Sequence, residues 1–374
     1  MNTRSGKKGQ VEVQFNWIFV LIVGAILLAF FVTIALRQKE ASEVGLTADF
    51  FINFEKALSG ISASKGKTLL YDIPSMELRY DCIAGCDCAA YSGTSRARST
   101  ITPFAMNNQI IFSPNHLKGN KLLTLSKDWE YPYRVANFLF ITSPEVKYLI
   151  EDSTRGSALF DELPPEFIEQ DQAQQPAFTK ELFSVDEPIT GIQGNYKVKF
   201  VFFTSDPLTF TIPSAALSLP NSDVTAVKIT QSGSSGSVSF YVKEGNSFKK
   251  TGDSYLFGET TAFASIFAED LQAYSCMMNR AFKKYATVTS IYSKKQSEYF
   301  DYYNCVDENP SSEFKSVCCG SYDSSALSSL QGALSSFDFS RQDTSGLVAT
   351  IQNSITSFSA QNLNAIQESC PHIY

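Results

Sequence analysis

The residues with the clearest capacity for chemistry in this sequence are its eight cysteines. They form a group of three and a group of five, namely Cys82, Cys86 and Cys88, then Cys276, Cys305, Cys318, Cys319 and Cys370. Both groups are odd in number, so if every thiol is paired within the chain, at least one disulfide must join them. Cys318 and Cys319 are adjacent and would strain a ring if bonded to each other, so we expect them to take different partners.

Zinc binding is the other chemistry open to the first group. Cys82, Cys86 and Cys88 together with His116 could supply four ligands. Their spacing, Cys-x3-Cys-x-Cys, lacks the paired ligands typical of zinc sites. Disulfides are therefore favoured, each long loop contributing about 4 kcal/mol in the chain-entropy model, and no metal or other cofactor is predicted.

Three short motifs occur in the order used by penicillin-binding proteins and serine β-lactamases, and they resemble that family's set: Ser62-Ala63-Ser64-Lys65, Ser113-Pro114-Asn115 and Lys250-Thr251-Gly252. The resemblance would make Ser62 a nucleophile activated by Lys65. That nucleophile should open a buried helix, whereas Ser62 ends an amphipathic one, and residues 250–252 are expected in a turn. We therefore interpret the match as coincidence.

Other candidates for catalysis are few. His116 and His372 are the only histidines, so a Ser-His-Asp triad would require one of them, and a solvated loop histidine is the favoured interpretation. Glu151 and Asp152 follow an apolar strand pattern, at the edge where α/β sheets bind ligands. A solvated strand end is favoured there too, and no catalytic residue is predicted.

An uncharged apolar stretch, residues 15–36, fixes where these groups lie. A helix needs roughly 20 apolar residues to cross a bilayer, so this stretch predicts one transmembrane helix. Both flanks are basic, which gives a weak preference for a cytoplasmic N-terminus. All the cysteines follow the stretch, and disulfides form in oxidising compartments. We therefore expect a single-pass plasma-membrane protein with the bulk of its chain outside the cytoplasm.

The N-terminus carries a second signal. Lys7-Lys8-Gly9-Gln10-Val11, followed at once by the apolar helix, resembles the class III signal peptide of archaeal type IV pilin-like proteins. The resemblance implies cleavage between Gly9 and Gln10, with the helix kept as anchor or filament core. Two features depart from the family: Gln14 stands where pilins usually carry an acidic residue, and the chain is far larger than a typical pilin. The alternative is an uncleaved signal anchor.

The remaining patterns predict an α+β or α/β protein. Apolar residues at helical spacing continue past the span to Ile61. Short β patterns follow, then longer apolar strands at 146–150, 196–204, 224–229 and 238–242. The predicted order is a basic leader (1–14), the transmembrane helix (15–36), a membrane-proximal helix (37–66), a β-rich cysteine-containing domain (67–144), a Rossmann-like α/β domain (145–260) and a disulfide-linked helical region (261–374).

Three finer expectations depend on local signals. Gly245-Asn246 predicts a hairpin turn, and the Gln-rich stretch 169–175 predicts an exposed loop. The apolar stripe from Phe263 to Ile291 is too long for an ordinary helix, so we expect a break near the β-branched run 287–291 or a projecting arm.

Composition narrows the function. The formal net charge is −7 and no large basic cluster lies beyond the N-terminal flank, so nucleic acid is not an expected partner. The sequence favours an anchored surface protein with a structural, assembly or attachment role, whose partners are the lipid bilayer and either another protein or further copies of itself. The alternative is an anchored cell-envelope hydrolase built on the α/β domain.

Overall fold

The computed structural model describes most of the chain, namely residues 9–64, 66–73, 77–83, 86–92, 104–105, 109–170, 173–189, 191–192, 194–305, 318–341 and 344–374. The chain divides into two compact units, Met1–Asn53 and Phe54–Tyr374. The leader charges Arg4, Lys7 and Lys8 lie outside the described residues, as does Lys65. The β-rich, α/β and helical regions predicted from the sequence all lie in the second unit.

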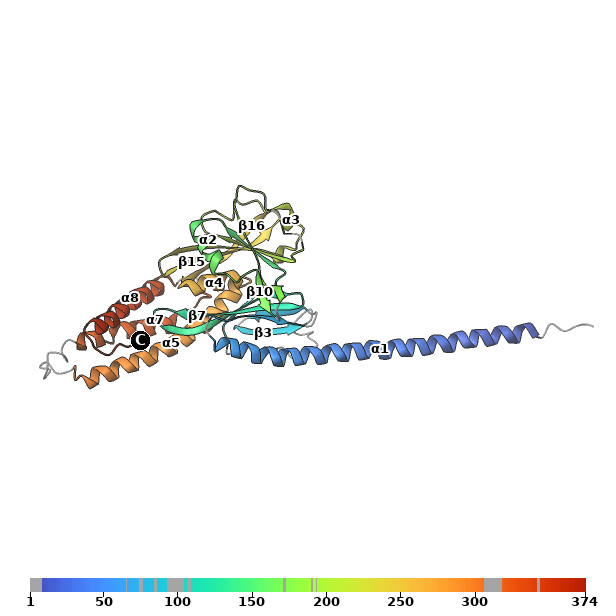
Figure 1. Cartoon of the computed structure of the whole chain (residues 1–374), viewed down its shortest axis with the longest axis horizontal. Helices are drawn as coiled ribbons and strands as arrows, with labels where there is room; N and C mark the ends of the chain where they lie inside the picture. Colours follow the sequence, from blue (N-terminus) through green and yellow to red (C-terminus); the bar gives the residue numbers. More distant parts are fainter. Residues whose placement is uncertain are drawn as a thin grey trace, which may run out of the picture. The chain divides into compact units, whose positions relative to one another are not determined.

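Helix α1 (Gly9–Ser62) contains the predicted span (Figure 1). Within it, Trp17–Gln38 has 22 residues, a mean hydropathy of 3.0 and no buried residue, so it is long and apolar enough to cross a membrane. No other helix in the described part of the chain meets this test. Gly66, whose positive φ of 63° suits glycine, follows the helix end.

Two small sheets begin the second unit. The first has the order β1-β7-β8-β5, and the last turns of α1 bury Phe54, Leu58 and Ile61 in the same unit. The second has the order β4-β3-β2-β6. Their strands are β1 (Thr68–Asp72), β2 (Leu78–Ile83), β3 (Asp87–Ser92), β4 (Phe104–Ala105), β5 (Ile111–Phe112), β6 (His116–Leu117), β7 (Lys121–Glu130) and β8 (Arg134–Thr142).

A mixed six-stranded sheet forms the centre of the unit, in the order β12-β9-β13-β14-β15-β16. The first four strands are parallel, and β15 and β16 add an antiparallel hairpin that turns at Gly245 and Asn246. Every residue of β9 and β13 is buried, which explains their near-continuous apolar sequences. The strands are β9 (Val146–Glu151), β12 (Thr179–Phe183), β13 (Lys197–Phe202), β14 (Val224–Ser232), β15 (Ser235–Glu244) and β16 (Ser247–Phe257).

Short elements connect the parallel strands. Helix α2 (Thr154–Glu162) follows β9, while α3 (Ser214–Leu217) and the 3-10 turn η2 (Asn221–Asp223) precede β14. The Gln-rich stretch is a hairpin rather than the predicted loop, because β10 (Phe167–Gln170) pairs with β11 (Ala173–Pro176). The prediction of exposure holds for Gln174, since its backbone is paired but its side chain faces solvent.

Helix α4 (Glu259–Phe267) lies between the central sheet and the β1-β7-β8-β5 sheet (Figure 1). Phe267 packs against Tyr148 of the central sheet and Phe140 of the smaller one. Residues 260–267 are all buried, and the hydroxyls of Thr260, Thr261 and Ser265 donate to main-chain carbonyls. The opposite face of the central sheet packs around Phe200, Phe202 and Phe248.

The C-terminal helices are α5 (Leu271–Tyr302), α7 (Ser325–Ser336) and α8 (Ser345–Gln367), with a 3-10 turn η3 (Gly320–Tyr322) before α7. The predicted break near 287–291 is wrong, because α5 continues through it. The break lies at 268–270, where Asp270 accepts a hydrogen bond from the Ala273 amide at 2.8 Å and starts a new helix. Helix α7 packs against α5, so α5 is not a free arm.

Candidate functional site

Disulfides use all eight cysteines. The pairs are Cys82–Cys88, Cys86–Cys276, Cys305–Cys319 and Cys318–Cys370. Cys86–Cys276 joins the two odd groups across 190 residues of sequence, and Cys318 and Cys319 have different partners. The three cysteines of the zinc alternative, Cys82, Cys86 and Cys88, are therefore all disulfide-bonded, so none of them offers a thiolate to a metal.

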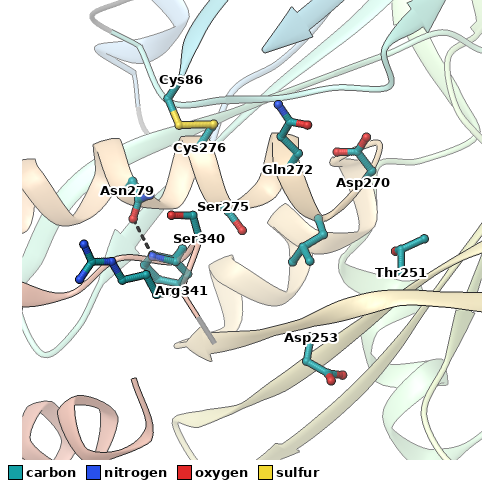
Figure 2. Close-up of a pocket in the computed structure, with 12 residues that line it drawn as sticks. Cys86, Thr251, Asp253, Asp270, Gln272, Ser275, Cys276, Asn279, Ser340 and Arg341 are labelled. Carbon is teal, nitrogen blue, oxygen red and sulfur yellow. Dashed lines mark hydrogen bonds between the residues drawn. A yellow bond between two sulfur atoms is a disulfide. The ribbon is translucent and has the colours of Figure 1, made fainter. Parts of the chain in front are cut away.

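A groove crosses the Cys86–Cys276 bridge. One part is a cavity of about 410 Å³ between β16, the start of α5 and the segment after α7, and a wider hollow of about 1120 Å³ continues along α5. Figure 2 shows Gln272, Ser275 and Asn279 along α5 beside the Cys86–Cys276 bridge, with Thr251 and Asp253 of β16 on the other side of α5 from the Gln272 amide. We call this feature the bridge groove. Its volume is in the range of ligand-binding pockets.

Most polar groups of the bridge groove already have partners. Asn279 binds the segment after α7, donating to Asp338 at 2.9 Å and accepting from the Phe339 amide at 2.8 Å (Figure 2). Gln272 donates to the Cys82 carbonyl at 3.0 Å. Ser275 differs, because its buried hydroxyl oxygen has no hydrogen-bond partner among the described residues. A buried hydroxyl without a partner can bind a ligand that enters the cavity.

Glu151 is the last residue of β9, at the carboxyl edge of the central sheet. The prediction that this strand end is solvated is wrong for Glu151. Glu151 is only 3% exposed, and its carboxylate accepts hydrogen bonds from the amides and hydroxyls of Thr204 and Ser205. Burial alone would raise its pKa, but these hydrogen bonds outweigh burial and lower the pKa to about 2. Asp152 is exposed and accepts from the Ser157 hydroxyl. Glu151 therefore fixes the loop after β13 rather than facing a ligand.

The three lactamase-like motifs do not form a site. Ser62 donates to the Ser59 carbonyl and Ser113 to the Pro114 carbonyl. Residues 250–252 lie within β16, not in the predicted turn, and the Thr251 hydroxyl donates to Phe240 at a bulge between β15 and β16. No hydrogen bond joins two of the motifs within the described ranges, which exclude Lys65.

His116 is not the predicted solvated histidine. It lies in β6, about nine-tenths buried, and its imidazole contacts the Glu77 carboxylate. Burial lowers its pKa, and the nearby cations Arg79, Lys118 and Lys197 act in the same direction against Glu77. His372 is exposed near the C-terminus, and its carbonyl accepts from Lys295.

A buried charged cluster was missed at the sequence level. Lys197 of β13 lies 2.8 Å from both carboxylate oxygens of Glu269, 3.1 Å from the Asn115 side-chain oxygen and 3.6 Å from Asp223. The side chains of Lys197 and Glu269 are 3% and 8% exposed. The signal available was Lys197-Val198-Lys199, two lysines inside an otherwise apolar strand, because buried lysines require partners.

Comparisons of the chain with protein-family models, with curated proteins and with solved structures return no match.

Proposed function

We propose that the chain is a membrane-anchored extracytoplasmic protein with a structural, assembly or attachment role. One observation carries this proposal. An apolar helical span without buried residues, Trp17–Gln38, is followed by a unit in which every cysteine is disulfide-bonded. Disulfides persist in oxidising spaces outside the cytoplasm, and a span of this length holds such a unit at the membrane.

We propose pilin-like anchoring as the specific form of attachment. Cleavage between Gly9 and Gln10 would leave a mature chain that begins at the start of α1, with the apolar helix available for packing in the membrane. The leader charges lie outside the described residues, so the resemblance of the sequence KKGQV is the support for this step.

We assign the second unit a scaffolding role. We interpret the parallel order β12-β9-β13-β14 as a Rossmann-like layer, in which the switch point would fall between β9 and β13. In such layers ligands bind at this point, but here Glu151 and the 203–205 loop bind each other. This observation favours attachment over the hydrolase alternative. The bridge groove, with the Ser275 hydroxyl, is the surface we assign to contact with the protein partner that an attachment role requires.

The test compares the full chain with a variant lacking residues 10–36, both extracted under non-reducing conditions and sized in the same detergent. We expect the full chain to form an ordered oligomer, or to retain a partner, and the shortened chain to be a monomer. N-terminal sequencing of the full chain should begin at Gln10. A monomeric full chain that hydrolyses envelope material would contradict the proposal and support the alternative.

A further inference from the structure

The buried cluster around Lys197 brings together an amine, a carboxamide and a carboxylate. Lys197 donates to the Asn115 side-chain oxygen at 3.1 Å and to both Glu269 oxygens at 2.8 Å. The Asn115 backbone amide donates to Glu269 at 3.0 Å. Glu269 thus contacts both the amine and the residue that carries the carboxamide.

Three separate parts of the fold hold these groups in place. Asn115 lies in the turn between β5 and β6, Lys197 begins β13, and Glu269 lies at the junction of α4 and α5. Lys199 lies two residues further along β13, on the same face of the strand. It donates to the carbonyls of Ala268 and Glu269 at 2.7 and 3.2 Å. The junction is therefore held by hydrogen bonds from the Lys199 amine to its main-chain carbonyls, which do not involve the Glu269 carboxylate.

This arrangement suits amide formation between side chains. An amine becomes nucleophilic when it is desolvated and loses its proton to a nearby base. Reactants held within hydrogen-bond distance in a buried site avoid most of the entropic cost of encounter. Lys197 and Glu269 are buried, whereas Asn115 is exposed, so a released ammonium ion has a path to solvent.

We propose that Lys197 and Asn115 form an intramolecular isopeptide bond, with Glu269 as the catalytic acid and base. Glu269 takes a proton from the Lys197 ammonium, and the free amine adds to Cγ of Asn115. Glu269 passes that proton to Nδ2 as the Cγ–Nδ2 bond breaks. Glu269 then carries a second proton from the new amide nitrogen to the departing ammonia. The Asn115 Nδ2 nitrogen therefore leaves as ammonium, and the new amide keeps one N–H. The reaction consumes no oxidant or other reactant.

The bond would link the β6 region covalently to the central sheet. The linked residues are 82 positions apart, and no cysteine lies in the sequence between them. A covalent tie at this point resists separation of the small sheets from the central one. The inference does not depend on membrane anchoring, because it rests on side chains of the second unit alone.

The experiment is tryptic peptide mapping of the full chain after denaturation, reduction and alkylation. We expect peptide 99–118 joined to peptide 181–199, lighter than their sum by one ammonia, with no cleavage after Lys197. The intact protein should show the same loss. Free peptides that end at Lys118 and Lys197, at full mass, would overturn the proposal, and so would a link from Lys197 to Asp223 with loss of water.

Variants separate catalysis from structure. Asn115→Ala should abolish the link, and Glu269→Gln should leave Lys197 and Asn115 unlinked although both are present. Asn115→Asp should restore a link at the same position with loss of water in place of ammonia, which keeps the proposal testable if Glu269→Gln does not fold. Lys243→Met is the matched control and should remain linked, because it removes another buried lysine of the same sheet, whose hydrogen bonds go to the carbonyls of Ala216, Leu217 and Leu219. A Glu269→Gln protein that folds and is fully linked would contradict the role of Glu269.

Discussion

The central sheet and the C-terminal helical region are stabilised in different ways. Residues 146–257 contain no cysteine, and their strands pack around rings such as Phe200 and Phe202. The helices α7 and α8 are rich in Ser, Gln and Asn, and Cys318–Cys370 closes the region that contains them. The central sheet is therefore stabilised without disulfides, whereas the helical region combines a buried apolar face, which includes Leu330 and Phe358, with disulfide bonds.

Lysines of the sheet add a second difference. At the C-terminus of three helices in this layer, the amine of a lysine on the central sheet donates to a main-chain carbonyl. These lysines are Lys180 for α2, Lys243 for α3 and Lys199 for α4. A cation at a helix C-terminus is favoured by the unpaired carbonyls and by the helix dipole. In the described residues, no lysine donates to the last carbonyls of α8. The C-terminal turn of α8 is instead followed by the disulfide at Cys370.

The largest expected effect comes from breaking the long bridge. The chain-entropy model gives about 5 kcal/mol for a bridge across 190 residues and about 2 kcal/mol for one across 6 residues. Replacing both Cys86 and Cys276 with Ser should therefore lower the free energy of unfolding by about 3 kcal/mol more than replacing Cys82 and Cys88. Urea unfolding of the two double variants measures this difference. Equal losses would mean that both bridges act only locally.

Glu151→Gln should cost about 2 kcal/mol, because an amide accepts fewer of the hydrogen bonds that the carboxylate receives from Thr204 and Ser205. Asp152→Asn is the matched control on the exposed neighbour and should change stability by less than about 0.5 kcal/mol. Urea unfolding at pH 7 compares the two variants. A similar loss in both would show that the hydrogen-bonded loop contributes little.

The same carboxylate predicts a dependence on pH. Its folded pKa of about 2 lies below the ordinary value of 4.5, so the unfolded chain binds the proton more tightly. Its contribution to stability is fully present above pH 4.5 and is lost as pH falls toward 2. Thermal unfolding between pH 6 and 2 should show a steeper decline for the natural protein than for Glu151→Gln. Parallel curves would contradict the lowered pKa.

Lys243→Met should cost about 1 kcal/mol, since it keeps the apolar stem and removes hydrogen bonds to the carbonyls of Leu217 and Leu219. Lys249→Met, an exposed position on the neighbouring strand, is the control and should be close to neutral. Chemical unfolding measures both. A destabilised control with an unaffected Lys243→Met would reverse the interpretation of lysines as helix caps.

The smallest effect is expected at the bridge groove. Ser275→Ala removes a buried hydroxyl that has no hydrogen-bond partner in the described part of the chain, so folding stability should stay within about 0.5 kcal/mol of the natural protein or rise slightly. Binding of a partner in the groove should weaken, measured by co-purification under non-reducing conditions. A strong loss of stability would show that the hydroxyl is already used within the fold.

Sequence patterns predicted the elements that depend on local physics. Apolar runs identified β9 and the first part of β14, because strand residues that are buried on both faces are mostly apolar. The odd number of cysteines in each group required at least one bridge between the groups if all were paired. The choice of Cys86 with Cys276 depends on how distant parts pack, which no local pattern contains. The same reason hid the contact of Lys197 with Glu269, 72 residues away. The start of α5 was predictable in principle, since Asp270 is a favoured N-cap residue.

Labelling of intact cells with a membrane-impermeant, lysine-reactive reagent tests the central claim most directly. Lys249 and Lys294 are exposed on the second unit, with side chains 62% and 81% accessible, so both should be labelled without breaking the cells. Labelling of these lysines only after the membrane is opened would place the disulfide-bonded unit in the cytoplasm and contradict the account.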